Sequence, residues 1–177
     1  QVLAYSKMLG QLHDAGNTTT VAHYLQLLSQ AGMVTGLAKY SGRAVRQRAS
    51  SPKLQVLNTA LFTSAAATSV GDVQSDPAVH GRLVESAVGA HLANAAASGQ
   101  CQLSYWREGD DEVDFVVRAG RTLVALEVKS GRPRHGKSGA AAFAKAHRPT
   151  RMMLVGTEGI PLQEFLSTPV PALLAAS

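Results

Sequence analysis

The chain has 177 residues, of which 45% are hydrophobic, and its formal net charge is +5. This length can bury one or two small cores, and the basic balance favours an anionic partner. The single cysteine, Cys101, excludes an internal disulfide, and no apolar run of about 18 residues is present to span a membrane, so we expect a cytoplasmic protein.

The N-terminal part of the sequence predicts two consecutive helices. Residues 5–13 have a helical pattern, and a short turn follows them. Asn17 or Thr18 is the expected N-cap of the second helix, which carries apolar residues at helical spacing to about Ala31. Gly32 is the expected C-terminal stop of this helix. The chain begins without Met at its first position, and we expect it to be a fragment of a longer protein.

Two short predicted strands, residues 33–37 and 54–57, enclose a basic loop that contains glycine. Helix, turn, helix and a basic two-stranded wing form the pattern of a winged helix-turn-helix, which we predict for residues 1–75. The polar face of the second helix has no Arg or Lys, so DNA reading and packing against another protein both stay open for it. The expected contacts to a nucleic-acid backbone are the wing residues Arg43, Arg46 and Arg48.

A second domain is predicted for residues 76–177, after a polar stretch at 71–77 that we interpret as a linker. The element order is helix, three strands, helix and strand, which indicates an α/β domain with helices packed on a mixed sheet. These elements are a long Ala-rich helix over 79–97, a strand over 102–107, a hairpin over 112–129, a helix over 138–147 and a strand over 151–155.

Charged residues interrupt both strands of the predicted hairpin, where a core strand should be apolar. With an even turn, Thr122 would face Val117, and Ala125 would face Asp114. Asp114, Glu127 and Lys129 would then share one face of the hairpin, with roughly 7–8 Å between the diagonal positions of the two carboxylates. This register depends on the absence of a bulge.

Two carboxylates at such a separation can hold one hard cation between them. Mg²⁺ prefers one or two carboxylates and polarises a phosphate, so Asp114 and Glu127 are candidate metal ligands and Lys129 a candidate for holding the attacking water. Glu85, on the preceding helix, would complete the shell, because a carboxylate beside apolar neighbours needs a partner. The alternative is an ion-paired patch in which Lys129 neutralises Glu127 or Asp114.

An acid on a helix, an Asp in a strand and a Glu-x-Lys on the next strand resemble the PD-(D/E)XK nuclease superfamily. Glu85, Asp114, Glu127 and Lys129 match its four core positions in order, and Val113 stands where the family has Pro. The resemblance covers roughly residues 79–156. It implies a restriction-endonuclease-like α-β-β-β-α-β domain, with Mg²⁺ or Mn²⁺ bound by the three acids and catalysis by all four residues.

A wider resemblance covers nearly the whole chain. The sequence is similar to the uncharacterised domain that follows the ATPase core of many prokaryotic AAA+-type ATPases, although residues 58–61 depart from an expected Asp-x-Gly-Leu pattern. This resemblance implies an N-terminal ATPase core in the same polypeptide as a partner. The blocks that carry it are residues 5–7, 23–28, 31–34, 51–53, 105–107, 112–116 and 127–131.

Residues 131–138 match the P-loop pattern G-x-x-x-x-G-K-[ST] letter for letter. Too little chain follows for a nucleotide domain, and the last predicted strand ends without an Asp for Mg²⁺. We therefore expect no ATP site in this fragment and interpret the segment as a basic loop beside the carboxylates. Its candidate phosphate contacts are Arg132, Arg134 and Lys137.

The sequence thus leaves two classes of function open. The first is a DNA-directed module of an AAA+-type ATPase that hydrolyses phosphodiesters with a divalent metal. The second is a catalytically silent module that uses the same fold to bind DNA or protein subunits, including further copies of itself. Metal-dependent DNA cleavage distinguishes them.

Overall fold

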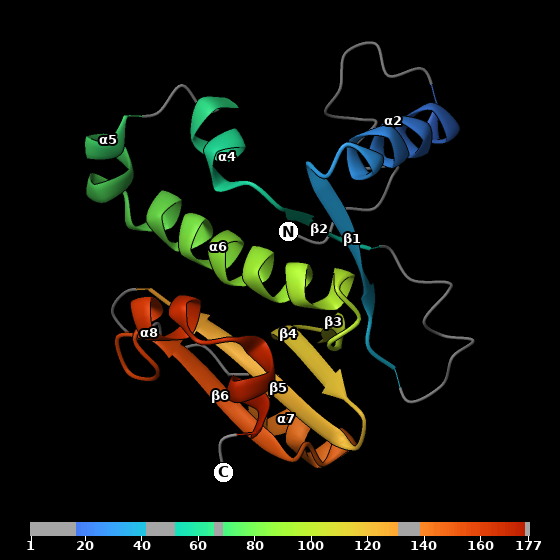
Figure 1. Cartoon of the computed structure of the whole chain (residues 1–177), viewed down its shortest axis with the longest axis vertical. Helices are drawn as coiled ribbons and strands as arrows, with labels where there is room; N and C mark the ends of the chain where they lie inside the picture. Colours follow the sequence, from blue (N-terminus) through green and yellow to red (C-terminus); the bar gives the residue numbers. More distant parts are fainter. Residues whose placement is uncertain (1–16, 42–51, 66–68, 131–138, 176–177) are drawn as a thin grey trace.

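The structure is a computed structural model that describes residues 17–41, 52–65, 69–130 and 139–175. In these ranges six strands form one mixed sheet in the order β2-β1-β3-β4-β5-β6. The long helix α6 crosses one face of the sheet and α7 packs on the other (Figure 1). No helix among these residues is both long and apolar enough to cross a membrane.

The element bounds confirm the predicted order of helix, three strands, helix and strand after residue 76. The strands are β1 (Val34–Lys39), β2 (Lys53–Val56), β3 (Gln102–Glu108), β4 (Asp111–Ala119), β5 (Thr122–Lys129) and β6 (Arg151–Gly156). The helices are α2 (Thr18–Gln30), α4 (Thr59–Ala65), α5 (Val70–Ser75), α6 (Pro77–Ala97), α7 (Gly139–His147), α8 (Leu162–Ser167) and α9 (Val170–Ala175).

The N-terminal elements begin as the sequence predicts. Asn17 caps α2 by accepting a hydrogen bond from the backbone N–H of Thr20, and Gly32 follows the helix with a positive φ of 68°. β1 and β2 pair antiparallel, as expected of a wing. The first helix of the predicted winged helix, residues 5–13, lies outside the described residues, and the winged-helix assignment stays a prediction.

The β1–β2 hairpin is also part of the main sheet. β1 pairs in parallel with β3, with Ala38 opposite Ser104 and Lys39 opposite Tyr105. Strands on both sides of the predicted boundary at residues 75 and 76 therefore belong to one six-stranded sheet. The predicted division into two domains therefore has to be compatible with a sheet that continues across the predicted boundary.

The polar segment predicted as a linker, residues 71–77, is not irregular, because most of it is the short helix α5. Ser69 and Asp72 form a capping box. The side chain of each residue accepts a hydrogen bond from the backbone N–H of the other. Asp76 then caps α6, with Pro77 at its first position. Asp72 and Asp76, two of the polar residues that suggested a linker, belong to helix caps.

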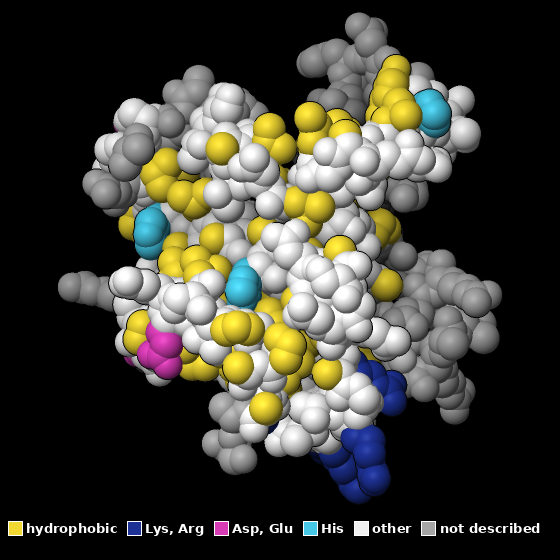
Figure 2. Space-filling model, in the orientation of Figure 1, with side chains coloured by type: hydrophobic (Ala, Val, Ile, Leu, Met, Phe, Trp, Pro, Cys, Tyr) yellow, Lys and Arg dark blue, Asp and Glu magenta, His cyan; other side chains and the backbone are white. Residues whose placement is uncertain are grey.

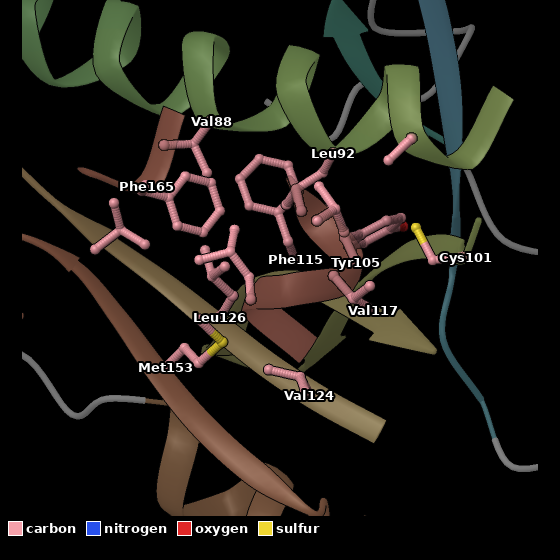
Figure 3. Close-up of a cluster of buried hydrophobic side chains, with 14 of the residues drawn as sticks. Val88, Leu92, Cys101, Tyr105, Phe115, Val117, Val124, Leu126, Met153 and Phe165 are labelled. Atoms are coloured by element: carbon pink, nitrogen blue, oxygen red, sulfur yellow. The ribbon is translucent and has the colours of Figure 1, made fainter. Parts of the chain in front are cut away.

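Two hydrophobic clusters hold the layers together on opposite faces of the sheet. On one face, Val88 and Leu92 of α6 pack onto Phe115 and Leu126 of the central strands, and Phe165 of α8 closes the same cluster (Figure 3). Each of these side chains is at most 2% exposed. Burial of this size is the main source of the stability of the fold.

The second cluster lies beneath α7. Phe143 of α7 packs against Trp106 of β3, with a ring-centroid distance of 5.3 Å, and against Tyr40, which follows β1, at 5.6 Å. His147 lies 5.2 Å from the ring of Tyr40. These contacts attach the end of β1 to the face of the sheet that α7 covers.

The register of the β4–β5 hairpin differs from the predicted one by two residues. Thr122 lies opposite Ala119 and Ala125 opposite Val116, so the predicted pairings with Val117 and Asp114 are wrong. The turn contains only two residues, and Gly120 adopts the positive φ of 57° that such a tight turn requires. The sequence pattern alone did not fix this turn length.

Gly89 permits a close approach of β2 to α6. A Cβ atom at this position would lie 2.0 Å from the side-chain oxygen of Gln55, whose amide nitrogen donates to the carbonyl oxygens of Val56 and Ser86. We expect Gly89→Ala to lower the free energy of unfolding by about 1–3 kcal/mol, measured by urea denaturation, because overpacking outweighs the gain in helix propensity.

Gly81→Ala is the matched control in the same helix, because its added Cβ would meet only the rotatable hydroxyl of Ser130 at 3.1 Å. We expect it to change the free energy of unfolding by less than about 1 kcal/mol. In a Gln55→Ala background the cost of Gly89→Ala should fall. An equal cost in both backgrounds would show that Gln55 is not the source of the clash.

Candidate functional site

The ammonium group of Lys53 lies at the centre of a cluster of carboxylates. Its Nζ is 2.7 Å from Oε1 of Glu85 on α6, 3.6 Å from Oε1 of Glu112 and 3.8 Å from Oδ1 of Asp114, both on β4. It also donates to the carbonyl oxygen of Asp114 at 3.4 Å and lies 5.1 Å from the ring centroid of Phe115. Lys53 is 2% exposed, so a full positive charge is buried among three acids.

A β-bulge places Asp114 in this cluster. Between the pairs Ser104–Val116 and Trp106–Val113, β3 has one residue and β4 has two, one of which is Asp114. The extra residue of a bulge turns neighbouring side chains away from strict alternation and bends the strand. The carboxylate of Asp114 thereby reaches Lys53 on the side of the sheet that α6 covers.

Asp114 also joins the two central strands where their backbone pairing ends. The last residues that pair at this end of β4 and β5 are Phe115 and Leu126. Beyond them, Oδ2 of Asp114 accepts a hydrogen bond of 2.9 Å from the backbone N–H of Val128. The carboxylate of Asp114 thus accepts the hydrogen bond that a backbone carbonyl of β4 would accept in a regular ladder. It therefore lies beside the segment that carries Glu127 and Lys129.

Glu127 and Lys129 form a separate ion pair, with 3.8 Å between Oε2 and Nζ. Leu126 belongs to the cluster under α6 and Ala125 to the cluster under α7. Alternation along β5 therefore places Glu127 and Lys129 on the face of Ala125. The single face predicted for these two residues and Asp114 is not observed, because the bulge turns Asp114 toward α6.

Electrostatics support the charged state of Lys53. Burial alone lowers the pKa of its ammonium, but the charges of Glu85, Asp114 and Glu112 outweigh this effect, so the pKa is raised above its ordinary value. Burial raises the pKa of Asp114 to about 6, against the opposing effects of Lys53 and the hydrogen bond from Val128. Lys53 is therefore a cation at neutral pH, and Asp114 is mostly ionised.

The structure brings together two of the four predicted site residues, Glu85 and Asp114, and adds two that the sequence analysis did not assign to the site, Lys53 and Glu112. As the side chains of the described residues stand, no group of three His, Cys, Asp or Glu residues is arranged to hold a metal ion. The predicted nucleic-acid contacts all lie outside the described residues: Arg43, Arg46, Arg48, Arg132, Arg134 and Lys137.

A short pattern in the sequence could have pointed to Lys53. In β2, Lys53 and Gln55 alternate with apolar residues, and both polar side chains are buried, with exposures of 2% and 3%. Such alternation does not say which face is inward. Only the docking of β2 against α6 makes the polar face the buried one.

Comparison with known proteins identifies the family of this chain. Residues 80–173, more than half of the sequence, match a domain of unknown function, DUF4143. The chain belongs to the DUF4143 family. No curated protein and no solved structure matches it. The matched DUF4143 region contains Glu85, Glu112 and Asp114 but not Lys53.

We predict that Lys53→Met destabilises the protein by about 3–5 kcal/mol in metal-free buffer, because it leaves three clustered carboxylates without their buried counter-ion. Urea denaturation at pH 7 measures this change. Lys39→Met on β1 is the control, and it should cost less than about 1 kcal/mol because the described residues place no carboxylate cluster around that side chain. Equal losses for the two variants would contradict the role of Lys53 in the cluster.

The raised pKa of Asp114 predicts a pH dependence of stability. An acid whose folded pKa lies above its unfolded value favours the folded state below the unfolded pKa, and this contribution is lost as pH rises through the folded pKa. Between about pH 4 and 6, Asp114 therefore lowers the stability of the wild type as pH increases.

Asp114→Asn keeps an oxygen acceptor for the Val128 N–H but does not titrate. Urea denaturation between pH 4 and 8 should show a less negative slope for Asp114→Asn than for the wild type over that window. Superimposable profiles would mean that Asp114 titrates normally in the folded protein.

Proposed function

We propose that the chain is a DNA-directed module with a divalent-metal-dependent nuclease site. The observation that carries this proposal is the convergence of Glu85 and Asp114, from different elements, on one buried cation. Carboxylate oxygens such as these are the ligands that Mg²⁺ and Mn²⁺ prefer in proteins. The ammonium group of Lys53 marks the position at which these carboxylates hold a positive charge.

The roles of the residues follow from their places on the strands. Glu85 and Asp114 would hold the metal, which when bound polarises a phosphodiester and lowers the pKa of a water. Glu127, the third proposed ligand, would have to turn from the face of Ala125 to reach the same ion. The hydrogen bond from Val128 fixes the Asp114 carboxylate next to the segment of Glu127 and Lys129. Lys129, with a side chain that is 37% exposed, would position the attacking water or neutralise charge on the phosphate.

The element order supports the fold that this function requires. The order α6-β3-β4-β5-α7-β6 is the one expected of a PD-(D/E)XK domain, and the bulge at Asp114 is the kind of local distortion that occurs beside active sites. We propose the same superfamily for this region, with a winged helix before it and an N-terminal AAA+-type ATPase core as its partner in the polypeptide.

Two observations favour the second candidate, a catalytically silent module. Lys53 already pairs with the carboxylates, and α2 exposes three large apolar side chains, Tyr24, Leu27 and Leu28, each more than a third exposed. Hydrophobic side chains gather over α2 at the upper right of Figure 2. Exposed apolar groups of this kind fit docking to a protein surface better than contact with DNA.

DNA cleavage tests the proposal. The purified chain should nick supercoiled plasmid DNA in the presence of Mn²⁺ or Mg²⁺ but not of EDTA. Asp114→Asn and Lys129→Met should each reduce the rate by about 100-fold or more, because Asp114 would hold the metal and Lys129 would act on the attacking water or the phosphate. Glu127→Gln tests the third proposed ligand in the same assay.

Lys39→Met is the matched lysine control and should retain the wild-type rate. If the wild type does not cleave DNA but binds it in a salt-sensitive manner, the silent DNA-binding module is the better description. If it neither cleaves nor binds DNA at low salt, a protein-docking function replaces both.

A further inference from the structure

We propose that the exposed apolar face of α2 packs against the same face of a second copy of this chain, so that the protein forms a twofold-symmetric dimer. The proposal goes beyond the nuclease and does not rest on it, because α2 carries none of the acids of the candidate site. It names a partner for the helix face that protein docking would use.

Large apolar side chains form a stripe along the exposed side of α2. Tyr24, Leu27 and Leu28 have exposed fractions of 53%, 47% and 39%, and their spacing of three and four residues places them on one side of the helix. Met33, also 39% exposed, stays beside the end of the helix because its backbone N–H donates to the carbonyl oxygen of Leu28 at 2.9 Å. These four residues, the α2 stripe, belong to the hydrophobic side chains over α2 in Figure 2. A contiguous apolar surface of this kind marks a protein contact.

A different face of α2 attaches the helix to the sheet. Val21 is 2% exposed, and Ala22 and Leu25 line a groove between the helix and the β1–β2 hairpin. With 3.6 residues in each turn, these residues lie on another side of the helix from Leu27. The contacts that hold α2 on the sheet therefore leave the α2 stripe available to a partner.

The α2 stripe lies in a part of the sequence without formal charges. No Asp, Glu, Lys or Arg occurs from Asn17 to Ala38. A nucleic-acid backbone is bound by Lys and Arg, and a charged protein surface is bound by charges of the opposite sign. The α2 stripe therefore fits a neutral apolar surface, and a second copy of the chain provides such a surface.

Twofold symmetry makes the absence of charge informative. Close to a twofold axis each side chain meets its own copy, so a charged residue there would meet a like charge. The whole chain has a net charge of +5, and two copies repel each other wherever basic surfaces meet. The α2 stripe adds nothing to this repulsion. Gln30, three residues after Leu27, borders the stripe with an amide that both donates and accepts, so it can pair with its own copy.

Sedimentation equilibrium of the chain tests the dimer. Between about 1 and 100 µM the wild type should pass from the mass of a monomer to that of a dimer, as expected of a small interface. Leu27→Glu should raise the dissociation constant by about 100-fold or more, because it removes an apolar contact and places like charges at the axis. Met152→Glu on β6 is the matched control. Its side chain is 37% exposed and lies outside the α2 stripe, so this variant should dimerise like the wild type.

Complementary charges distinguish a second copy from any other occupant. Leu27→Glu and Leu27→Lys should each be monomeric alone, and an equal mixture of the two should recover the dimer. A wild type that stays monomeric over the whole range overturns the proposal, and so does a mixture that stays monomeric. A lower Tm of Leu27→Glu with no change in mass would also overturn it, because another part of the same chain would then cover Leu27. None of these outcomes decides the nuclease, which metal-dependent DNA cleavage tests.

Discussion

The ion pairing of Lys53 with Glu85, Glu112 and Asp114 is the constraint on which the rest of this structure depends. β2 has only four residues and lies at the edge of the sheet, where backbone pairing to a single neighbour is weak. A buried lysine is costly unless acids surround it, and three clustered acids are costly without a cation. The buried lysine therefore requires the three acids, and the acids require the lysine.

The N-terminal hairpin is held on both faces of the sheet. On the α6 face, Lys53 and Gln55 of β2 contact the helix. On the α7 face, Tyr40 packs against Phe143 and His147. A wing without such contacts could move relative to the rest of the sheet. This hairpin is instead held by polar contacts on one side and by aromatic contacts on the other. Any function of the carboxylates is thereby linked to the position of the hairpin.

The sequence predicted what periodicity and caps can encode. The N-cap at Asn17, the long helix that became α6 and the strand order around Asp114 follow from local patterns, and the structure contains all of them. The register of the β4–β5 hairpin was not predictable, because it depends on whether the turn takes two residues or more. The bulge at Asp114 was equally hidden, since it appears only in how β4 pairs with β3, and the residues of β4 alone do not show that one of them is extra.

The composition of the candidate site shows why its cation was missed. Helices α4 and α5 separate Lys53 in the sequence from α6, which carries Glu85, and the sequence analysis assigned Lys53 to no site. The DUF4143 match starts at residue 80 and contains the acids without it. Within the matched region, Glu85, Glu112 and Asp114 would repel one another at neutral pH with no internal cation beside them. A stable cluster then needs either the preceding hairpin or a bound metal, and the same need for positive charge underlies both the fold of this chain and its proposed chemistry.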